Sequence, residues 1–280
     1  MKEPLVSVLI CTYNAEKTIT RTLNSILDQT YKNFEVLVLD NNSKDNTLEI
    51  LYKYQKKDKR INIFNEWKNL WAYWGLNYLL DKAKWKYIAI QDHDDVRYPI
   101  KLEEQVKFLE NKQNSKYIGC WSAYLQYYSA SKCWFICRNN ENDVEWVPHT
   151  SLMFRKTGKR YDISNDFLWD IYFMRNILWN WEKIYHMDNR VLLLHYCKEN
   201  WWNYSDVWFR LNKKNIKRYF SVSKISFKTF VDLWYMIICK FLPSKLRNRF
   251  SKVMMFTTHR VMNQHELQKN TYCSMLLSYI

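Results

Sequence analysis

The segment VSVLICTYNAEKTITRTLNSILDQTYKNFEVLVLDNNSKDNT, residues 6–47, joins two short apolar runs through an amphipathic stretch. The first run, VSVLIC at 6–11, predicts a strand, and the second, FEVLVLD at 34–40, predicts a strand buried on both faces. The stretch between them, residues 15–30, places four apolar side chains on one helical face: Ile19, Leu23, Ile26 and Leu27. The segment therefore predicts a strand, helix and strand in succession, the repeat from which parallel sheets are built.

The same alternation continues beyond this segment. Ser43 is placed to cap a helix that carries Leu48, Leu51 and Tyr52 on one side. The further elements expected are a strand at 61–66, a helix around 69–82 and a strand at 87–91. This repetition predicts an α/β fold, with a Rossmann-like, mostly parallel sheet flanked by helices.

Polar clusters follow three of these apolar runs, as CTYNAE, DNNSKDNT and QDHDD. In open parallel sheets the ligand binds outside the carboxyl ends of the strands, so the clusters are expected at one rim. Crowded carboxylates repel one another and are tolerated when they are solvated or bind a cation. Oxygen ligands favour Mg²⁺ or Mn²⁺, ions that commonly bridge to phosphates. For QDHDD alone, a solvated helix cap is an equally good interpretation.

Together, these residues resemble a family 2 glycosyltransferase of the GT-A fold. The resemblance covers about the first 200 residues, and residues 6–47 match the family's opening strand, Tyr-Asn loop, first helix, second strand and Asp-x-x-Ser-x-Asp turn. QDHDDVRYPIKLEEQV, residues 91–106, is similar to the family's Asp-x-Asp-Asp motif, its proline and the following helix start. The resemblance implies an inverting transferase of the hexosyl type that uses a nucleotide-sugar and contributes to polysaccharide biosynthesis.

The resemblance also implies roles for individual residues. Tyr13 would lie on the uracil or another base, with Asp40 and Asn41 at the edge of that base. Asp92 would lie near the ribose, and Asp94 would hold Mn²⁺ or Mg²⁺ on the diphosphate, with Asp92 as a second ligand. The residues assigned to the nucleotide-sugar, which is expected to be UDP-linked, are Thr12, Tyr13, Asn14, Asp40, Asn41, Asn77 and Asp92.

An inverting transfer needs a general base that removes the proton from the acceptor hydroxyl. The acceptor-side pattern of the family, counted from Asp162, places this base at Asp170, with Asp166 as the alternative. Two departures from the family concern the donor side: Trp71 replaces a glycine and Leu76 replaces an arginine. His195 lies in a segment that departs from the family pattern, and a packing role is the better interpretation for it.

The resemblance divides the chain in two. Residues 1–203 form the expected GT-A domain, with a nucleotide-sugar-binding half at 1–111 and an acceptor half at 112–203. Residues 204–280 form a basic, aromatic-rich extension that is expected to be helical. The expected partners are the nucleotide-sugar donor and a glycan, glycolipid or glycoprotein acceptor.

The charge of the chain, formally +15, is concentrated in the extension, where residues 211–260 carry twelve Lys or Arg and one acid, Asp232. The apolar run TFVDLWYMIIC in this segment is too short to span a bilayer, so its basic surroundings suit either an anionic membrane surface or packing on a protein. Scattered cysteines in odd number and a short N-terminal apolar run predict a cytoplasmic protein, peripheral on the cytosolic membrane face if the first alternative holds. A catalytically inactive GT-A scaffold is the main alternative function, and a nucleic-acid-binding protein is a weaker one.

Overall fold

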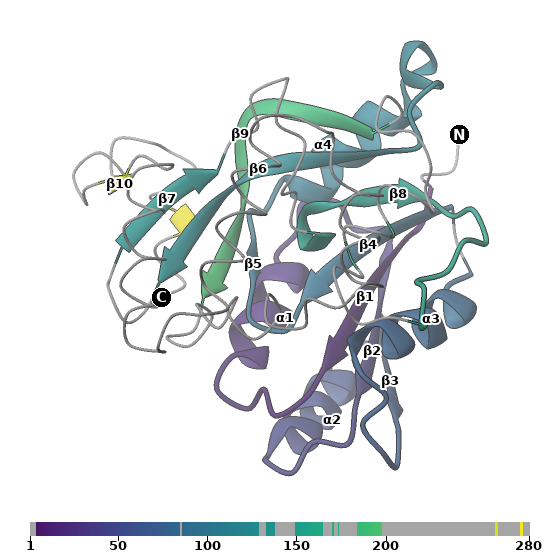
Figure 1. Cartoon of the computed structure of the whole chain (residues 1–280), viewed down its shortest axis with the longest axis vertical. Helices are drawn as coiled ribbons and strands as arrows, with labels where there is room; N and C mark the ends of the chain where they lie inside the picture. The colour runs from purple at the N-terminus through teal and green to yellow at the C-terminus, as the bar shows by residue number, and fades with distance from the viewer. Residues whose placement is uncertain are drawn as a thin grey trace, which may run out of the picture.

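The computed structural model is built around one mixed sheet flanked by helices (Figure 1). The structure describes residues 4–84, 86–128, 133–137, 149–164, 170, 173, 184–197, 261–262 and 275–276. The helices are α1 (Ile19–Leu27), α2 (Thr47–Lys57), α3 (Ala72–Lys82), α4 (Lys101–Glu110) and the 3₁₀ turns η1 (Lys112–Asn114) and η2 (His149–Ser151). The strands are β1 (Val6–Thr12), β2 (Phe34–Asp40), β3 (Ile61–Asn65), β4 (Tyr87–Asp92), β5 (Val96–Arg97), β6 (Gly119–Tyr128), β7 (Cys133–Cys137), β8 (Met153–Arg155), β9 (Ile184–Cys197) and β10 (Val261–Met262).

The first half of the chain confirms the predicted parallel sheet. Strands β3, β2, β1 and β4 lie side by side in this order and all run parallel. Beyond β4 the sheet becomes mixed, because β8 pairs antiparallel with β4 and with β6, while β6 pairs parallel with β9. The predicted α/β architecture is therefore correct, and the antiparallel strands of the second half complete it.

Side chains of the parallel strands alternate between two hydrophobic cores, one on each face of the sheet. Leu9, Leu37 and Ile90 pack on the face that α3 covers. Val8 and Val36 point to the opposite face, which α1 and α4 cover. Burial on both faces explains the continuous hydrophobicity of these strands.

One prediction about a helix start is wrong. Helix α2 begins at Thr47, with Asn46 as the residue before it, so Ser43 is not its cap. The Ser43 hydroxyl donates instead to Asp40 Oδ1 at 2.5 Å, and the Ser43 amide donates to Asp40 Oδ2 at 3.0 Å. Ser43 binds the carboxylate of Asp40, at the end of β2, because the two residues lie in one tight turn.

The expected extension at 204–280 lies largely outside the described residues. Two parts of it are described: β10 pairs antiparallel with β7, and Leu276 is fully buried in a core shared with Val96 and Leu125. In the part of the chain that the structure describes, no helix combines the length and apolar character needed to cross a membrane. The domain boundary at residue 203 remains a prediction.

Gly75 gives a test of the packing between α3 and the sheet. A Cβ at this position would overlap the Cys11 sulfur and lie 2.8 Å from Leu39 Cδ2. Alanine improves helix propensity by about 1 kcal/mol, whereas overpacking costs about 1–3 kcal/mol. We therefore expect Gly75→Ala to lower the free energy of unfolding by up to about 2 kcal/mol in a denaturant titration. Adding Cys11→Ala should recover part of this loss, and a raised midpoint for the single variant would contradict the packing.

Candidate active site

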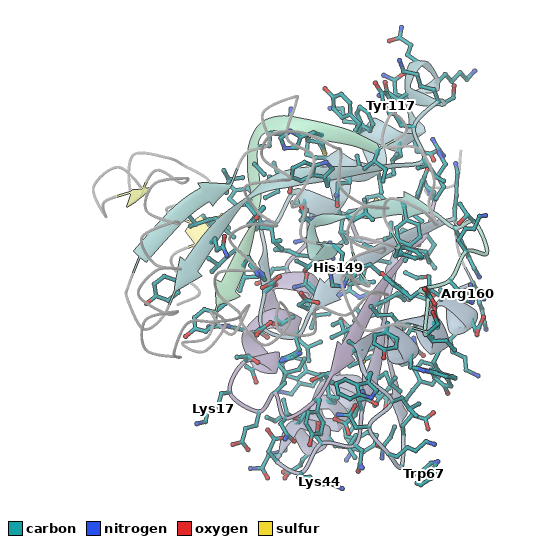
Figure 2. All side chains as sticks on the ribbon, in the orientation of Figure 1. Lys17, Lys44, Trp67, Tyr117, His149 and Arg160 are labelled. Carbon is teal, nitrogen blue, oxygen red and sulfur yellow. The ribbon has the colours of Figure 1, made fainter. Side chains whose placement is uncertain are left out.

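Three polar loops meet at one edge of the parallel sheet. The strand register places Thr12 of β1 beside Asp40 of β2, and Cys11 of β1 beside Asp92 of β4. The loops after β1, β2 and β3 lie at the lower end of the view, where Lys17, Lys44 and Trp67 mark them (Figure 2). The structure therefore brings together the clusters that the sequence placed at one rim.

The loops after β1 and β2 are joined by hydrogen bonds. Asn14 accepts from the Lys44 amide at 2.8 Å through its side chain, and its own amide donates to Ser43 Oγ at 3.0 Å. The Ala15 amide donates to Thr47 Oγ1 at 2.7 Å. Asn14 adopts a positive φ of 49°, which asparagine tolerates better than most residues. These contacts fix the loop that carries Tyr13, a residue that is 42% exposed at the surface.

Asp40 and Asn41 are almost completely buried. Both carboxylate oxygens of Asp40 accept from Ser43, as described above. The Asn41 side chain donates to Asn69 Oδ1 at 2.9 Å and accepts from the Leu70 amide at 2.8 Å. The two residues therefore organise the rim, and their contact with a nucleotide base remains a prediction.

The acidic turn after β4 is held by hydrogen bonds to its backbone. The Gln91 side chain donates to the carbonyls of Asp92 and Asp95, both at 3.0 Å, and so ties the two ends of the turn together. Thr22 of α1 donates to the carbonyls of His93 and Asp95 at 2.9 and 3.0 Å. With its backbone groups bonded to the scaffold, the turn presents its carboxylates in a fixed arrangement, with Asp92 and Asp94 half-buried and Asp95 buried.

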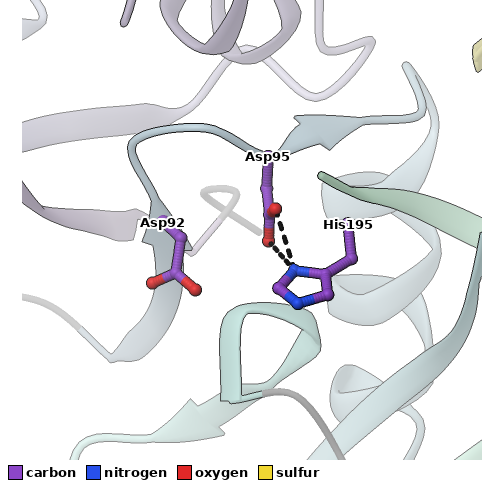
Figure 3. A group of neighbouring side chains, drawn as sticks. All are labelled: Asp92, Asp95 and His195. Atoms are coloured by element: carbon purple, nitrogen blue, oxygen red, sulfur yellow. Dashed lines mark hydrogen bonds and ion pairs between the residues drawn. The ribbon is translucent and has the colours of Figure 1, made fainter. Parts of the chain in front are cut away.

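Asp95 and His195 form a pair at the centre of this region (Figure 3). His195 Nδ1 lies 2.9 and 3.1 Å from the two carboxylate oxygens of Asp95, and the Tyr196 amide donates to Asp95 Oδ1 at 3.1 Å. The antiparallel pairing of β5 with β9 brings them together, because Val96 lies opposite Leu194. Asp95 therefore already has two partners, the His195 ring and the Tyr196 amide. Because His195 Nδ1 faces Asp95, the other ring nitrogen of His195 points away from Asp95.

A divalent cation fits this group. Ligand atoms of Asp92, Asp95 and His195 all lie within 4.8 Å of one another. Asp95 already contacts the His195 imidazole and the Tyr196 amide, so it is better suited to orient His195 than to bind an ion itself. Carboxylates that orient a metal-binding histidine in this way are common around protein metal ions. Asp92 and His195 then offer one oxygen and one nitrogen, whereas Asp94, on the same turn, is not part of this group, and its role as a metal ligand remains a prediction. An imidazole ligand favours Mn²⁺ over Mg²⁺, which prefers oxygen.

The environment of Asp92 is unusual for a carboxylate. Burial, together with the negative charges of Asp95 and Asp94, raises the pKa of Asp92 to about 6, although His149 opposes the rise. His149 Nε2 lies 3.8 Å from Asp92 Oδ1. The turn η2 positions this histidine, because the Asp92 amide donates to Thr150 Oγ1 at 3.1 Å. A carboxylate in this setting gains from a bound cation, which would neutralise the crowded charge.

Tyr161 is influenced electrostatically by both Asp92 and Asp170. Burial raises the pKa of the Tyr161 hydroxyl well above its ordinary value, and the charges of Asp170 and then Asp92 add to the rise. Both carboxylates therefore act electrostatically on one hydroxyl group. Asn77 fixes the Tyr161 backbone, since its side chain accepts from the Tyr161 amide at 2.7 Å and donates to the carbonyl at 2.9 Å. The donor-binding role expected for Asn77 and the catalytic role expected for Asp170 remain predictions, and Asp166 lies outside the described residues.

Sequence reasoning missed two features of the site. Asp95 was not given a role of its own, and His195 was assigned to packing. A signal for His195 is present in the sequence, because an imidazole at the end of the apolar run VLLL is an unusual place for a polar ring. Its pairing with Asp95 joins positions 100 residues apart, and that contact depends on how β9 pairs in the sheet.

Comparison with known proteins gives one family. The model of glycosyl transferase family 2 matches residues 7–167, more than half of the chain. An uncharacterized glycosyltransferase of Methanocaldococcus jannaschii is 39% identical over 127 residues, which cover 45% of this chain and 44% of the relative. An Escherichia coli UDP-Glc:alpha-D-GlcNAc-diphosphoundecaprenol beta-1,3-glucosyltransferase is 38% identical over 109 residues, 39% of this chain and 43% of the relative. The matched segment spans less than half the length of these relatives.

Solved structures show the same fold at low sequence identity. TarS residues 1–349 of S. aureus, solved with UDP-GlcNAc, superimposes with a TM-score of 0.55 at 17% identity and covers 89% of this chain and 87% of that one. A mannosyltransferase of Pyrobaculum calidifontis, solved with GDP-Man and Mn²⁺, gives a TM-score of 0.57 at 14% identity and covers all of this chain and 86% of that one.

Proposed function

Because this chain belongs to glycosyl transferase family 2, we propose that it moves a sugar from a UDP-linked donor to an acceptor hydroxyl, with inversion at the anomeric carbon. The observation that carries the proposal is the meeting, at one sheet edge, of the Tyr13 loop, the end of β2 and the acidic turn at Asp92–Asp95. A nucleotide-sugar needs a flat apolar face for its base, polar groups for its ribose and a cation for its diphosphate; these elements offer the first two and carboxylates that would bind the cation.

In this proposal the donor lies along the rim, with its base at Tyr13 and its diphosphate beside Asp92 and Asp94. Asp92 would hold the cation together with His195, which Asp95 orients, and Asp94 would be a further ligand from the same turn. The bound cation would neutralise the charge that develops on the leaving diphosphate. Support for a UDP donor comes from the E. coli relative, whose name specifies UDP-Glc, and from TarS with bound UDP-GlcNAc.

Asp170 removes the proton from the acceptor hydroxyl as that oxygen attacks the anomeric carbon from the face opposite the diphosphate. Its electrostatic effect on Tyr161, which Asp92 shares, supports a position on the acceptor side of the same crevice. The acceptor is a glycan, a glycolipid or a glycoprotein, and a lipid-linked sugar is favoured because the name of the E. coli relative specifies one. Attachment to an anionic membrane through residues 211–260 stays a prediction, and that segment lies outside the described residues.

A panel of UDP- and GDP-sugars, incubated with Mn²⁺ or Mg²⁺, tests the proposed function. We expect the full chain to release UDP from at least one UDP-sugar in the presence of Mn²⁺, and chelation of the cation should stop this release because the diphosphate would lose its counter-charge. Binding of UDP-sugars without release or transfer, with a range of acceptors supplied, would favour a catalytically inactive scaffold. Trp71 and the absence of a glutamate before Asp170 are the sequence features behind that alternative.

A further inference from the structure

Trp71 has a backbone conformation that a tryptophan rarely adopts. Its φ of 65° and ψ of 158° lie in a region that is populated essentially by glycine. The side chain does not offset this cost by burial, because Trp71 is 61% exposed. A bulky, exposed side chain at a position suited to glycine indicates that the indole itself has a use.

Hydrogen bonds on both sides hold Trp71 in this conformation. Its amide donates to Asn69 Oδ1 at 2.9 Å, and its carbonyl accepts from the Gly75 amide at 3.1 Å in the first turn of α3. Asn69 is fixed in turn, because its side-chain oxygen also accepts from the Asn41 side chain at 2.9 Å. These hydrogen bonds therefore impose the strained backbone conformation. They also fix the position of the backbone from which the indole extends.

Asn41 connects this loop to the loop that carries Tyr13. The Asn41 amide donates to the Thr12 carbonyl at 2.8 Å, next to Tyr13, and the Asn41 side chain accepts from the Leu70 amide at 2.8 Å, next to Trp71. The buried Asn41 thus forms a hydrogen bond with one chain neighbour of each exposed aromatic residue. Tyr13 and Trp71 consequently belong to one rim, with the end of β2 between them.

We propose that Trp71 binds the donor by stacking on its nucleobase. The inference rests on the proposed function, because it assigns the indole to the base end of the same nucleotide-sugar site. A base offers a flat π-face to an indole, and such stacking is sensitive to loss of the ring and tolerant of exchange between aromatic residues. This role would account for an exposed ring at a strained position.

Removal of the ring tests the proposal in calorimetric titrations of the full chain with UDP and Mn²⁺. We expect Trp71→Gly and Trp71→Asn to raise the dissociation constant by about ten-fold, equivalent to about 1.4 kcal/mol of lost stacking. Trp71→Phe should remain within about three-fold of the unchanged chain, since it retains a ring. Trp67→Gly is the matched control, because Trp67 follows the same strand and is 79% exposed, and its UDP affinity should be unchanged.

Stability and a second ligand separate the alternatives. Because glycine adopts this backbone conformation without strain, the melting temperature of Trp71→Gly should be no lower than that of the unsubstituted protein. Weaker UDP binding by this variant would then not reflect unfolding. The loss should be equal for UDP and UDP-glucose. A loss confined to UDP-glucose would place the indole at the sugar and overturn the proposal, as would unchanged UDP binding by both ring-free variants. Failure of the unchanged chain to bind UDP would instead contradict the proposed donor class.

Discussion

Replacement of Asp170 by asparagine should lower the rate of sugar transfer by about 10²- to 10⁴-fold and leave the affinity for the donor unchanged. The amide cannot accept the proton of the acceptor hydroxyl, whereas donor binding is proposed to depend on the loops after β1, β2 and β4. Transfer is measured with saturating donor and acceptor, and donor affinity by titration with the corresponding nucleoside diphosphate.

Two further variants serve as controls for this result. Asp162→Asn makes the same chemical change in the same region of the sequence as Asp170→Asn. Asp162 accepts a hydrogen bond from the Ser164 amide at 2.8 Å within a turn, so only a mild change in the transfer rate is expected. Asp166→Asn should also be milder than Asp170→Asn. If Asp166→Asn is inactive and Asp170→Asn retains transfer, the assignment of the base counted from Asp162 is wrong.

Replacement of Asp94 by alanine should abolish the metal-dependent binding of UDP and leave the chain folded. The cation would lose a main oxygen ligand while the charge of the diphosphate remains, and Asp94 is only half-buried, so its removal leaves no cavity in the core. Direct Mn²⁺ binding, measured by electron paramagnetic resonance without nucleotide, should weaken in parallel.

Glu49→Ala provides the control for that experiment. Glu49 lies on α2, where it forms an exposed ion pair with Lys53 at 2.7 Å, and its loss should leave Mn²⁺ and UDP binding unchanged. His195→Ala provides a second comparison, because it should weaken Mn²⁺ binding if the imidazole is a ligand. Unaltered Mn²⁺ dependence of UDP binding in Asp94→Ala would contradict the role assigned to this carboxylate.

Local patterns were sufficient to predict the parallel half of the fold. The run Phe34–Asp40 was predicted as a strand with the bounds that the structure shows, because continuous hydrophobicity and flanking polar residues mark a strand buried on both faces. The prediction for Ser43 failed for an equally local reason, since Ser43 donates hydrogen bonds to both carboxylate oxygens of Asp40 and α2 begins only at Thr47. The common rim followed from topology, because parallel strands end at the same edge.

Features that depend on distant pairing could not be predicted in this way. The pairing of β8 with β4 brings the preceding His149, and the pairing of β9 with β5 brings His195, to the acidic turn, and neither contact leaves a periodic trace in the sequence near Asp92. The backbone conformation of Trp71 also could not be predicted from residue propensities. Hydrogen bonds to Asn69 and Gly75 impose it, although tryptophan rarely adopts it.

Because β5 pairs with β9, we expect completion of the proposed cation site to be a late event in folding. Asp95 and His195 are 100 residues apart, so ordering this contact closes a long loop and costs more chain entropy than the neighbouring strand pairs. A nascent chain that has released Asp92, Asp94 and Asp95 from the ribosome still lacks the imidazole partner until β9 has been synthesised. If the chain binds Mn²⁺ as proposed, Mn²⁺ uptake during refolding should report when both halves of the chain have assembled.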